Sequence, residues 1–471
     1  MPLHSPQVIA FAAIALALYY LLPQRQNLTL LLASYVFCLF FPWPFLLLLW
    51  AVSWANYLLG IKAGAGARSK AWLCFGVFLN LLVFCGFKFA HLLIPGVTGA
   101  GASLSAAWQN GGARLLMPIG LSFYVLQAIS YLLDVHRGQV APSRDFIAFA
   151  LYMACFPKLS AGPIERFRAF APQVQRPRRL DGQRLSRGVA LLVTGLLRKV
   201  VIADTLLQAV PTLAFQKPHK FLGLELVIWL VVFILGLYND FCGYTDMARG
   251  IGSLFGIELS PNFNAPFFSR NFSEVWGRWH MTLSHWIRDY VYFPAGRALA
   301  RRFPRPAHPL NILVPPLLAM IASGLWHAPT RGFIMWGTLM GLLLAGERAL
   351  SLALPKSRPR KDPFWIHAAK SLAVSCLWSG ALVFALMDLP QALAFFVRIV
   401  TRMGSTLPDT RVFLLAVPSF WLDAMQVRRR GEPLFLSGLP WKRALLLGAA
   451  LLAVLLFAQS RPAIPFIYQD F

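Results

Sequence analysis

Long apolar runs recur along the chain, and they restrict its fold more than any other feature of the sequence. A helix that crosses a bilayer needs about 20 mostly apolar residues. Hydrophobic residues make up 58% of the chain and charged residues only 13%, whereas soluble proteins carry about 25% charged residues. A soluble core has no room for this much apolar surface. The sequence therefore predicts a polytopic integral membrane protein.

The apolar runs predict an all-α fold with about 11–13 membrane helices. The candidate spans are Gln7–Leu22, Leu28–Phe41, Phe45–Gly60, Ala71–Leu93, Leu116–Leu133, Gly188–Val210, Leu222–Asn239, Leu310–Trp326, Phe333–Leu350, Trp365–Met387, Val412–Met425 and Ala444–Phe457. Some of these runs are short. Pro42 and Pro44 stand between two of them and predict a sharp turn or a broken helix.

Three segments fit neither a full span nor an ordinary loop. Phe146–Phe156, Gln391–Val400 and Phe241–Phe293 are expected to be re-entrant or to lie along the membrane interface. Irregular backbone is tolerated at membrane depth only where it is buried in protein or faces a water-filled cavity. No internal repeat divides the sequence, so residues 1–471 are predicted to form a single membrane domain.

Basic residues gather in short clusters between the apolar runs, and they give the chain a net charge of +26. An excess of Lys and Arg marks the cytoplasmic loops of membrane proteins. The clusters at 62–70, 176–187, 297–305 and 356–361 are therefore placed in the cytoplasm, which puts the N-terminus outside. The same pattern argues against a nucleic-acid partner. No cysteine pair has CxxC spacing, so neither disulfides nor a cysteine metal site are expected.

One histidine stands where an apolar run ends. His327 closes the stretch Ser323–His327, just before the next apolar run. Polar groups are costly inside a membrane, so each is a functional candidate. Imidazole titrates near neutral pH and can take a hydroxyl proton as the oxygen attacks a carbonyl. The alternative is structural, a histidine that hydrogen-bonds a neighbouring carbonyl.

Aromatic, basic and acidic residues crowd the stretch Trp276–Tyr290, which contains His280 and His285. One interpretation is an interfacial helix with an aromatic belt and solvated charges. The other is zinc, because the spacing of the two histidines occurs in zinc sites. No HExxH motif and no cysteine pair accompany them, so no metal is expected.

A third polar stretch, Tyr238–Gly250, lies beside an apolar run and carries Asp240 and Asp246. Their separation does not place them on one helix face, so a carboxylate dyad is not expected. They are expected to orient a histidine or to pair with Arg249 or Arg278. An ordinary ion pair in a loop is the alternative.

A fourth stretch, Phe156–Arg168, contains Pro and Gly residues that break a helix, and cations follow them. Such a segment fits either a contact with a phosphate-bearing donor or an ordinary cytoplasmic turn.

Several short motifs follow one another in a specific order. They are Pro118–Tyr124, Ile129–Tyr131, Ala161–Pro163, Asp240-Phe241, Gly243-Tyr244, Asp246–Ala248, Trp279-His280, Trp286–Tyr290 and Ser323–His327. Together they resemble the membrane-bound O-acyltransferase family. More narrowly, the chain is similar to the bacterial branch that acetylates alginate and other exopolysaccharides. The similarity covers a motif-bearing core of about residues 115–350.

The resemblance implies a fold of many helices around a central polar tunnel. It implies that His327, in the Leu-Trp-His motif, is catalytic, and that His280 occupies the slot of a second catalytic polar residue. Residues expected to line or support the tunnel are Trp326, Asp240, Asp246, Arg278 and Asp289.

The chain also departs from the family pattern around these residues. Ala328–Gly332 replaces the usual Gly and Asn-aromatic pair after Trp-His, Met340 stands where a further histidine is common, and Gly277 replaces an arginine. These changes leave His327 in place. They bear on the acceptor and its docking more than on the reaction type.

The activity that the resemblance implies is transfer of an acetyl group from a cytoplasmic donor, with acetyl-CoA the simplest choice. The group would move towards hydroxyls of an exported polysaccharide such as alginate, by relay to a periplasmic acetyltransferase or export complex. The location would be the bacterial inner membrane, with the lipid bilayer as surroundings and no bound cofactor. Alternatives are D-alanyl transfer to teichoic acid, a transporter or flippase of lipid-linked precursors, and an inactive scaffold.

The basic clusters make a topology prediction. Reporter fusions after Lys70 and after Lys361 should both report a cytoplasmic position, because each follows a cluster of cations. Paired alkaline phosphatase and fluorescent protein fusions would measure this. A periplasmic signal at either point would overturn the orientation.

Overall fold

A computed structural model describes residues 3–64, 66–89, 117–354, 362–404, 414, 416–428 and 440–460. Every regular element in these residues is a helix. The all-α fold class expected from the apolar runs is confirmed. The uncharged loop at 95–112 and the basic cluster at 356–361 lie outside the described residues.

The helices before the midpoint of the chain include several short ones. They are α1 (Pro6–Leu21), η1 (Pro23–Arg25), α2 (Gln26–Cys38), α3 (Pro44–Ala63), α4 (Ser69–Lys88), α7 (Leu121–His136), α8 (Phe146–Ala154), α9 (Phe156–Leu159), α10 (Phe167–Val174), α11 (Gly182–Leu196), η3 (Leu197–Ala203), α12 (Asp204–Ala209), α13 (Leu213–Gln216) and η4 (Pro218–Lys220).

The second half begins with the longest helix. Its elements are α14 (Gly223–Leu254), η5 (Pro266–Phe268), α15 (Phe272–Trp276), α16 (Met281–Ile287), η6 (Arg288–Tyr292), α17 (Phe293–Arg302), α18 (Pro309–His327), α19 (Arg331–Ala353), α20 (Phe364–Leu386), α21 (Leu389–Thr401), α23 (Ala416–Arg428) and α24 (Pro440–Ser460).

Seven helices in the described residues are long and apolar enough to cross a membrane, or eight if one bent pair counts as a span. This is fewer than the 11–13 expected from the apolar runs. The run at Gly188–Val210 is divided among α11, η3 and α12, and it contains the buried charges Arg198, Lys199 and Asp204. Apolar runs therefore include segments that the protein itself buries, as well as segments that face lipid.

The bent pair is α1 and α2, which meet at an angle of 106°. The corner between them hydrogen-bonds to distant segments of the chain. Gln26 donates to the carbonyl of Arg178 at 2.7 Å, and Tyr20 donates to the carbonyl of Leu254 at 2.8 Å. Arg178 belongs to the second basic cluster, so the corner lies on the side of the protein that the sequence places in the cytoplasm.

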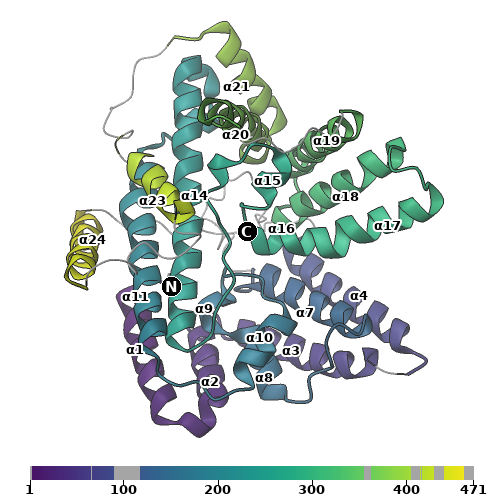
Figure 1. The fold of residues 1–471 in the computed structure, drawn as a ribbon, viewed down its shortest axis with the longest axis vertical. Helices are drawn as coiled ribbons and strands as arrows, with labels where there is room; N and C mark the ends of the chain where they lie inside the picture. The colour runs from purple at the N-terminus through teal and green to yellow at the C-terminus, as the bar shows by residue number, and fades with distance from the viewer. Residues whose placement is uncertain are drawn as a thin grey trace.

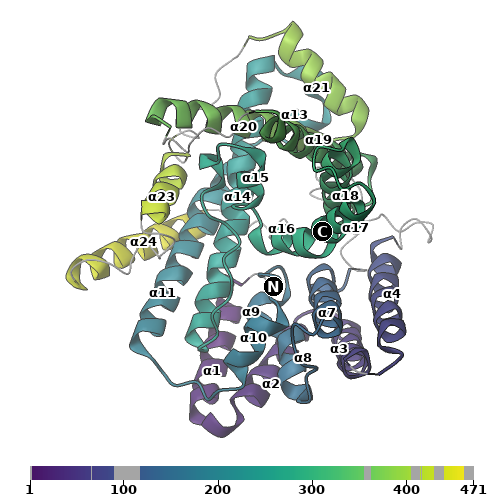
Figure 2. The same ribbon diagram turned by 45° about the vertical axis from the view of Figure 1, so that its right-hand side comes forward.

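Helix α14 is the centre of the fold. In its most apolar stretch, 83% of the residues are buried inside the protein. The corresponding share is 11% in α4 and in α24. Figure 1 shows α14 running through much of the length of the molecule with α11 beside it, while α24 projects from the side. The first helices, α1 to α4, lie at one end in both views (Figures 1 and 2). The outer helices therefore present apolar side chains to lipid, and α14 presents its side chains to protein.

Glycines allow α11 and α14 to approach closely. A Cβ atom on Gly195 would lie 2.6 Å from the carbonyl oxygen of Gly243, and one on Gly250 would lie 2.8 Å from that of Gly188. Real Cβ atoms essentially never come this close to another atom. Small residues are the usual means by which helices in membranes bring their backbones together.

Buried ion pairs connect α14 to its neighbours through η3, which is a π-helix. Arg198 binds Asp423 of α23 at 2.7 Å, and Lys199 binds Asp204 at 2.8 Å and Asp240 at 2.7 Å. A π-turn inserts an extra residue into a helix and often marks a functional segment. Here it lets two consecutive cations reach different carboxylates.

The three ambiguous segments are all placed. Phe146–Phe156 forms α8 and the start of α9, which are buried, and Gln391–Val400 lies within α21. The third, Phe241–Phe293, comprises the end of α14 followed by η5, α15, α16 and η6. The last of these segments carries much of the candidate site.

The stretch after α8 is buried at Phe156–Ile164, so of the two alternatives for it an ordinary exposed turn does not hold there. Lys158 is fully buried and donates to Gln127 Oε1 at 2.5 Å and to the carbonyl of Tyr152 at 2.6 Å. Burial lowers the pKa of Lys158 to about 8. A lysine held this way is a core residue and does not reach a ligand at the surface.

The ion pair between Arg198 and Asp423 generates a stability prediction. Both side chains are 1% exposed, and removing one partner of a buried pair leaves the other charge uncompensated. Asp423→Ala should therefore lower the free energy of unfolding by about 3–5 kcal/mol. Denaturation of the purified protein in detergent, followed by tryptophan fluorescence, measures the change.

A matched control is Lys370→Ala, which breaks the exposed pair between Lys370 and Asp362. Its unfolding curve should stay close to that of the unchanged protein. Equal curves for the two variants would show that the buried pair does not hold α23 in place.

Candidate active site

Two histidines that are far apart in the sequence line one cavity. His327 is the last residue of α18, and His280 immediately precedes α16. Their cavity, here called the histidine cavity, has a volume of about 30 Å³. Its lining consists of Leu237, Trp276, Trp279, His280, Leu283, His327, Phe333, Trp336, Trp378 and Leu382. Apart from the histidines, the walls are aromatic or aliphatic.

Aromatic rings fix the position of His327. Its imidazole stacks on Phe333 with centroids 5.6 Å apart, and it meets the edge of Trp336 at 5.7 Å. Thr330 caps α19 by accepting from the backbone N–H of Phe333. The short turn between α18 and α19 therefore places Phe333 and Trp336 beside the histidine that ends α18.

The backbone of His280 has an unusual conformation, with φ of 41°. Non-glycine residues rarely adopt the left-handed region, and such strain is often found at functional sites. The imidazole is enclosed by Phe241 at 4.8 Å and Trp326 at 5.9 Å between ring centroids. Burial, with a smaller contribution from His327, holds the pKa of His280 well below its ordinary value. His280 is therefore neutral at pH 7.

Trp326 contacts both histidines and joins them to α7. Its ring lies 4.9 Å from that of His327 and 5.9 Å from that of His280. The indole N–H donates to the carbonyl of Ser122 in α7 at 3.1 Å. The supporting role predicted for Trp326 has a geometric basis in these contacts.

A larger pocket adjoins the histidine cavity. It has a volume of about 460 Å³, which is within the usual range for small-molecule sites of about 300–1,000 Å³. Trp276 lines both spaces, and Ser323, one helical turn before His327, lines the larger one. Arg288 and Arg348 also line it, and it is here called the arginine pocket.

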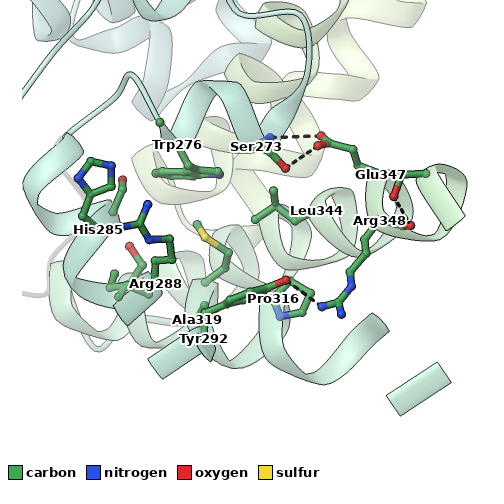
Figure 3. Close-up of a pocket in the computed structure, with 16 residues that line it drawn as sticks. Ser273, Trp276, His285, Arg288, Tyr292, Pro316, Ala319, Leu344, Glu347 and Arg348 are labelled. Carbon is green, nitrogen blue, oxygen red and sulfur yellow. Dashed lines mark hydrogen bonds between the residues drawn. The ribbon is translucent and has the colours of Figure 1, made fainter. Parts of the chain in front are cut away.

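Figure 3 shows how the ends of the arginine pocket differ. His285 and Arg288 lie at one end, Glu347 and Arg348 lie at the other, and Trp276 lies between them. Arg348 donates to Tyr292 at 2.8 Å. The pocket thus presents a guanidinium group at each end of a largely apolar interior, and either end suits an anionic group on a ligand with an uncharged chain.

Glu347 fixes the wall between the two spaces. Its carboxylate accepts from the backbone N–H of Phe272 at 2.7 Å and from the side chain of Ser273 at 2.5 Å. These bonds satisfy donors at the start of α15, the short helix that ends with Trp276. Helix α19 therefore positions the tryptophan that both spaces share.

The other predicted tunnel residues lie in ion pairs. Asp240 binds Lys199 at 2.7 Å, Asp246 binds Arg249 at 3.1 Å, and Arg278 binds Glu274 at 2.6 Å. Pairing of Asp246 with Arg249 was one of the expected arrangements and is confirmed.

Asp289 completes the set of predicted residues, and it binds Arg288 at 3.0 Å, beside the arginine pocket. None of these four, Asp240, Asp246, Arg278 and Asp289, is among the described residues that line the histidine cavity.

Sequence reasoning missed the aromatic lining of the cavity. Trp336, Trp378 and Phe333 lie in apolar runs, where a ring looks like any lipid-facing residue. The sequence pattern places Trp276 in an interfacial belt and Trp279 in the Trp279-His280 motif, but it assigns neither to the wall of a cavity. One sequence feature could have predicted this lining. Tryptophans recur beside His280 at a higher density than an interfacial belt requires.

The family of the chain follows from comparison with known proteins. A model of the membrane-bound O-acyltransferase family matches residues 8–387, which include every residue of the histidine cavity. The chain belongs to this family. Helices α21, α23 and α24 follow the matched region, so the pair between Arg198 and Asp423 joins the family core to a segment beyond it.

Relatives of the chain include three kinds of transferase. "Probable alginate O-acetylase AlgI" from Pseudomonas syringae pv. tomato is 39% identical over 73% of this chain and 65% of its own length. A peptidoglycan O-acetyltransferase from Helicobacter pylori is 28% identical over 74% of this chain and 70% of its own. A teichoic acid D-alanyltransferase from Streptococcus thermophilus is 30% identical over 50% of this chain and 57% of its own.

His280 and His285 are close in the sequence but line different pockets, and this separation generates a prediction about metal. His280 lines the histidine cavity and His285 lines the arginine pocket, so they do not converge on one point. The described residues hold no group of three or more metal-ligating side chains. Elemental analysis of the purified protein should find no stoichiometric zinc. One zinc per chain that disappears in His280→Ala would contradict this arrangement.

Proposed function

We propose that this protein is a membrane-embedded O-acetyltransferase of the bacterial inner membrane. It moves an acetyl group from a cytoplasmic donor, acetyl-CoA, towards hydroxyls of an exported polysaccharide such as alginate. The observation that carries the proposal is the meeting of His280 and His327 in one narrow cavity beside a larger pocket with two arginines. The proposed base and the enclosed cavity for the reaction thus lie next to a pocket through which the donor would enter.

The arginine pocket suits the donor. Coenzyme A carries phosphates at one end and a thioester at the end of an uncharged chain, and arginine binds phosphate oxygens through paired N–H groups. The arginine at one end of the pocket, Arg288 or Arg348, would meet the phosphates, while Trp276 and Ser323 lie towards the histidine cavity. The basic segment Arg297–Arg305, placed in the cytoplasm, follows Arg288 in the chain, so the pocket would be filled from that side.

His327 is the proposed general base. It would take the proton from an acceptor hydroxyl as the oxygen attacks the thioester carbonyl, and it would return a proton to the leaving sulfur. The surrounding rings exclude water, and a medium of low dielectric strengthens each polar contact at the reacting atoms. His280 is neutral, so it can donate one N–H to an oxygen while its other nitrogen accepts.

The acceptor is proposed to be a polymer reached from the periplasmic side. In this orientation α18 enters from the cytoplasm at Pro309 and ends at His327, so the base lies away from the donor entrance. Relatives carry the names of transferases for alginate, peptidoglycan and teichoic acid, which supports a polymer acceptor. Relay through a periplasmic acetyltransferase or an export complex would carry the group from the cavity to the polymer.

D-alanyl transfer to teichoic acid is the second candidate, because a relative with that name is 30% identical. Its alignment covers 50% of this chain, whereas the alignment with the alginate relative covers 73%. Mass spectrometry of the modified polymer separates the two candidates, because an acetyl ester and a D-alanyl ester differ in mass and only the second contains nitrogen.

The proposed function predicts the effect of removing the base. His327→Ala should reduce polymer acetylation by about 10²–10⁴-fold, the usual contribution of a general base. His280→Ala should reduce it less, since that residue is proposed to stabilise charge. Ester-bound acetate on the secreted polysaccharide, released by mild alkali and quantified, is the measurement.

The matched control is His219→Ala, which removes an exposed histidine in η4. Each variant must reach wild-type abundance in the membrane, because deleting a buried polar group can unfold a protein. If folded His327→Ala kept near-normal acetylation, the assignment of the base would be wrong.

A further inference from the structure

Tryptophans in this protein differ in what their indole N–H groups contact. Trp286 donates to the carbonyl of Leu126 at 2.8 Å, and Trp326 donates to that of Ser122 at 3.1 Å. The N–H groups of Trp276, Trp336 and Trp378 are also buried, yet no described residue accepts a hydrogen bond from them. A buried indole N–H usually finds an acceptor, so these three need an explanation.

All three of these tryptophans line the histidine cavity. Trp336 is 4% exposed and Trp378 is 3% exposed, so water at the surface does not satisfy their donors. All three therefore border the space that also contains His280 and His327, and Trp276 and Trp378 each border a second pocket as well. A ligand that brings an acceptor into this cavity would satisfy them, which makes the empty cavity selective for a group with a hydrogen-bonding oxygen.

We propose that the indole N–H of Trp336 binds the carbonyl oxygen of the acyl group during transfer. The inference rests on the proposed function. Trp336 is chosen because its ring meets His327 edge-on at 5.7 Å, whereas Trp378 packs against Trp279 at 4.7 Å. Trp276 packs against Trp336 at 5.8 Å and holds it from the side of the arginine pocket.

The donor serves the step in which charge develops. The acceptor oxygen forms a bond to the carbonyl carbon while its proton passes to His327, and the electron pair of the C=O bond moves onto the oxygen. That oxyanion accepts from the Trp336 N–H. The C=O bond then re-forms as the C–S bond breaks, and the leaving sulfur takes the proton from His327. A fixed donor that points at an oxyanion stabilises it more in an enclosed site than it would in water.

Indole suits this role because it does not titrate. It remains a donor at every pH at which the protein folds, and it carries no charge that would need a partner in an apolar cavity. The histidine cavity, at about 30 Å³, is far smaller than the arginine pocket, at about 460 Å³. Walls this close to the donor admit a short acyl group more readily than a long chain.

Two substitutions separate hydrogen bonding from packing. Trp336→Phe keeps an aromatic ring and removes the N–H, and Trp336→His keeps a ring N–H in a smaller ring. Inverted membrane vesicles that make the polymer are supplied with radiolabelled acetyl-CoA, and labelled polymer gives kcat and KM. We expect Trp336→Phe to lose about 10²-fold in kcat, as for other oxyanion donors, with the KM for acetyl-CoA changed less than about threefold.

Trp336→His should retain more activity than Trp336→Phe. If Trp336 acted only by packing, Trp336→Phe should retain more activity, because the Phe ring is closer to Trp in size and polarity than the His ring is. The matched control is Trp365→Phe, the same change on the exposed surface of α20, where Trp365 is 69% exposed. The inference would be overturned if Trp336→Phe had the kcat of the unchanged protein, or if Trp336→Phe were more active than Trp336→His.

A binding measurement tests the same contact without turnover. The full chain in lipid nanodiscs, labelled with ¹⁵N at its tryptophans, is titrated with acetonyl-CoA, a ketone that keeps the carbonyl and cannot transfer. The indole signal of Trp336, assigned by its loss in Trp336→Phe, should move downfield, whereas that of Trp365 should stay.

The outcomes distinguish this inference from the proposed function. If the analogue moves the signal of Trp276 but not that of Trp336, the donor binds and only the role of Trp336 is overturned. If no tryptophan signal moves at saturating analogue, acetyl-CoA is not the donor, and the inference that rests on it falls as well.

Discussion

The ion pairs that Arg198 and Lys199 make inside the helical body hold the central helix in place. Two adjacent cations in a π-turn reach carboxylates on α12, α14 and α23, and an unpaired charge at this depth would be costly. Because α14 is fixed at Asn239 and Asp240, its next residue Phe241 is fixed against the imidazole of His280. The strained position of that histidine thus depends on charges that do not touch the cavity.

The site itself combines polar groups with walls that exclude water. Its two imidazoles lie among aromatic rings, and edge and stacking contacts between α15, α18 and α19 keep these rings in position. Chemistry that transfers an acyl group needs this exclusion, because water would otherwise compete for the same carbonyl. The range matched by the family model contains both histidines and every other residue that lines their cavity.

Much of this was predictable from the sequence, because lipid imposes simple rules on composition and length. The all-α class, the family and the two histidines followed from apolar runs and motif order. Other features depend on contacts between residues far apart in the chain, such as Arg198 and Asp423, which are 225 positions apart. No local pattern marks such a pair. The aromatic lining was hidden for a related reason, since Trp336 and Trp378 lie in runs whose composition fits lipid contact equally well.

Trp276 forms a wall that the histidine cavity and the arginine pocket share, and this arrangement has a consequence for the cell. The proposed transfer from one face of a membrane towards the other would need a barrier to ions along the same route. Aromatic walls leave the histidine cavity with a volume of only about 30 Å³, and narrow hydrophobic segments can gate channels by excluding water. In the proposed reaction, the same aromatic walls that enclose the reacting atoms would also limit the passage of ions.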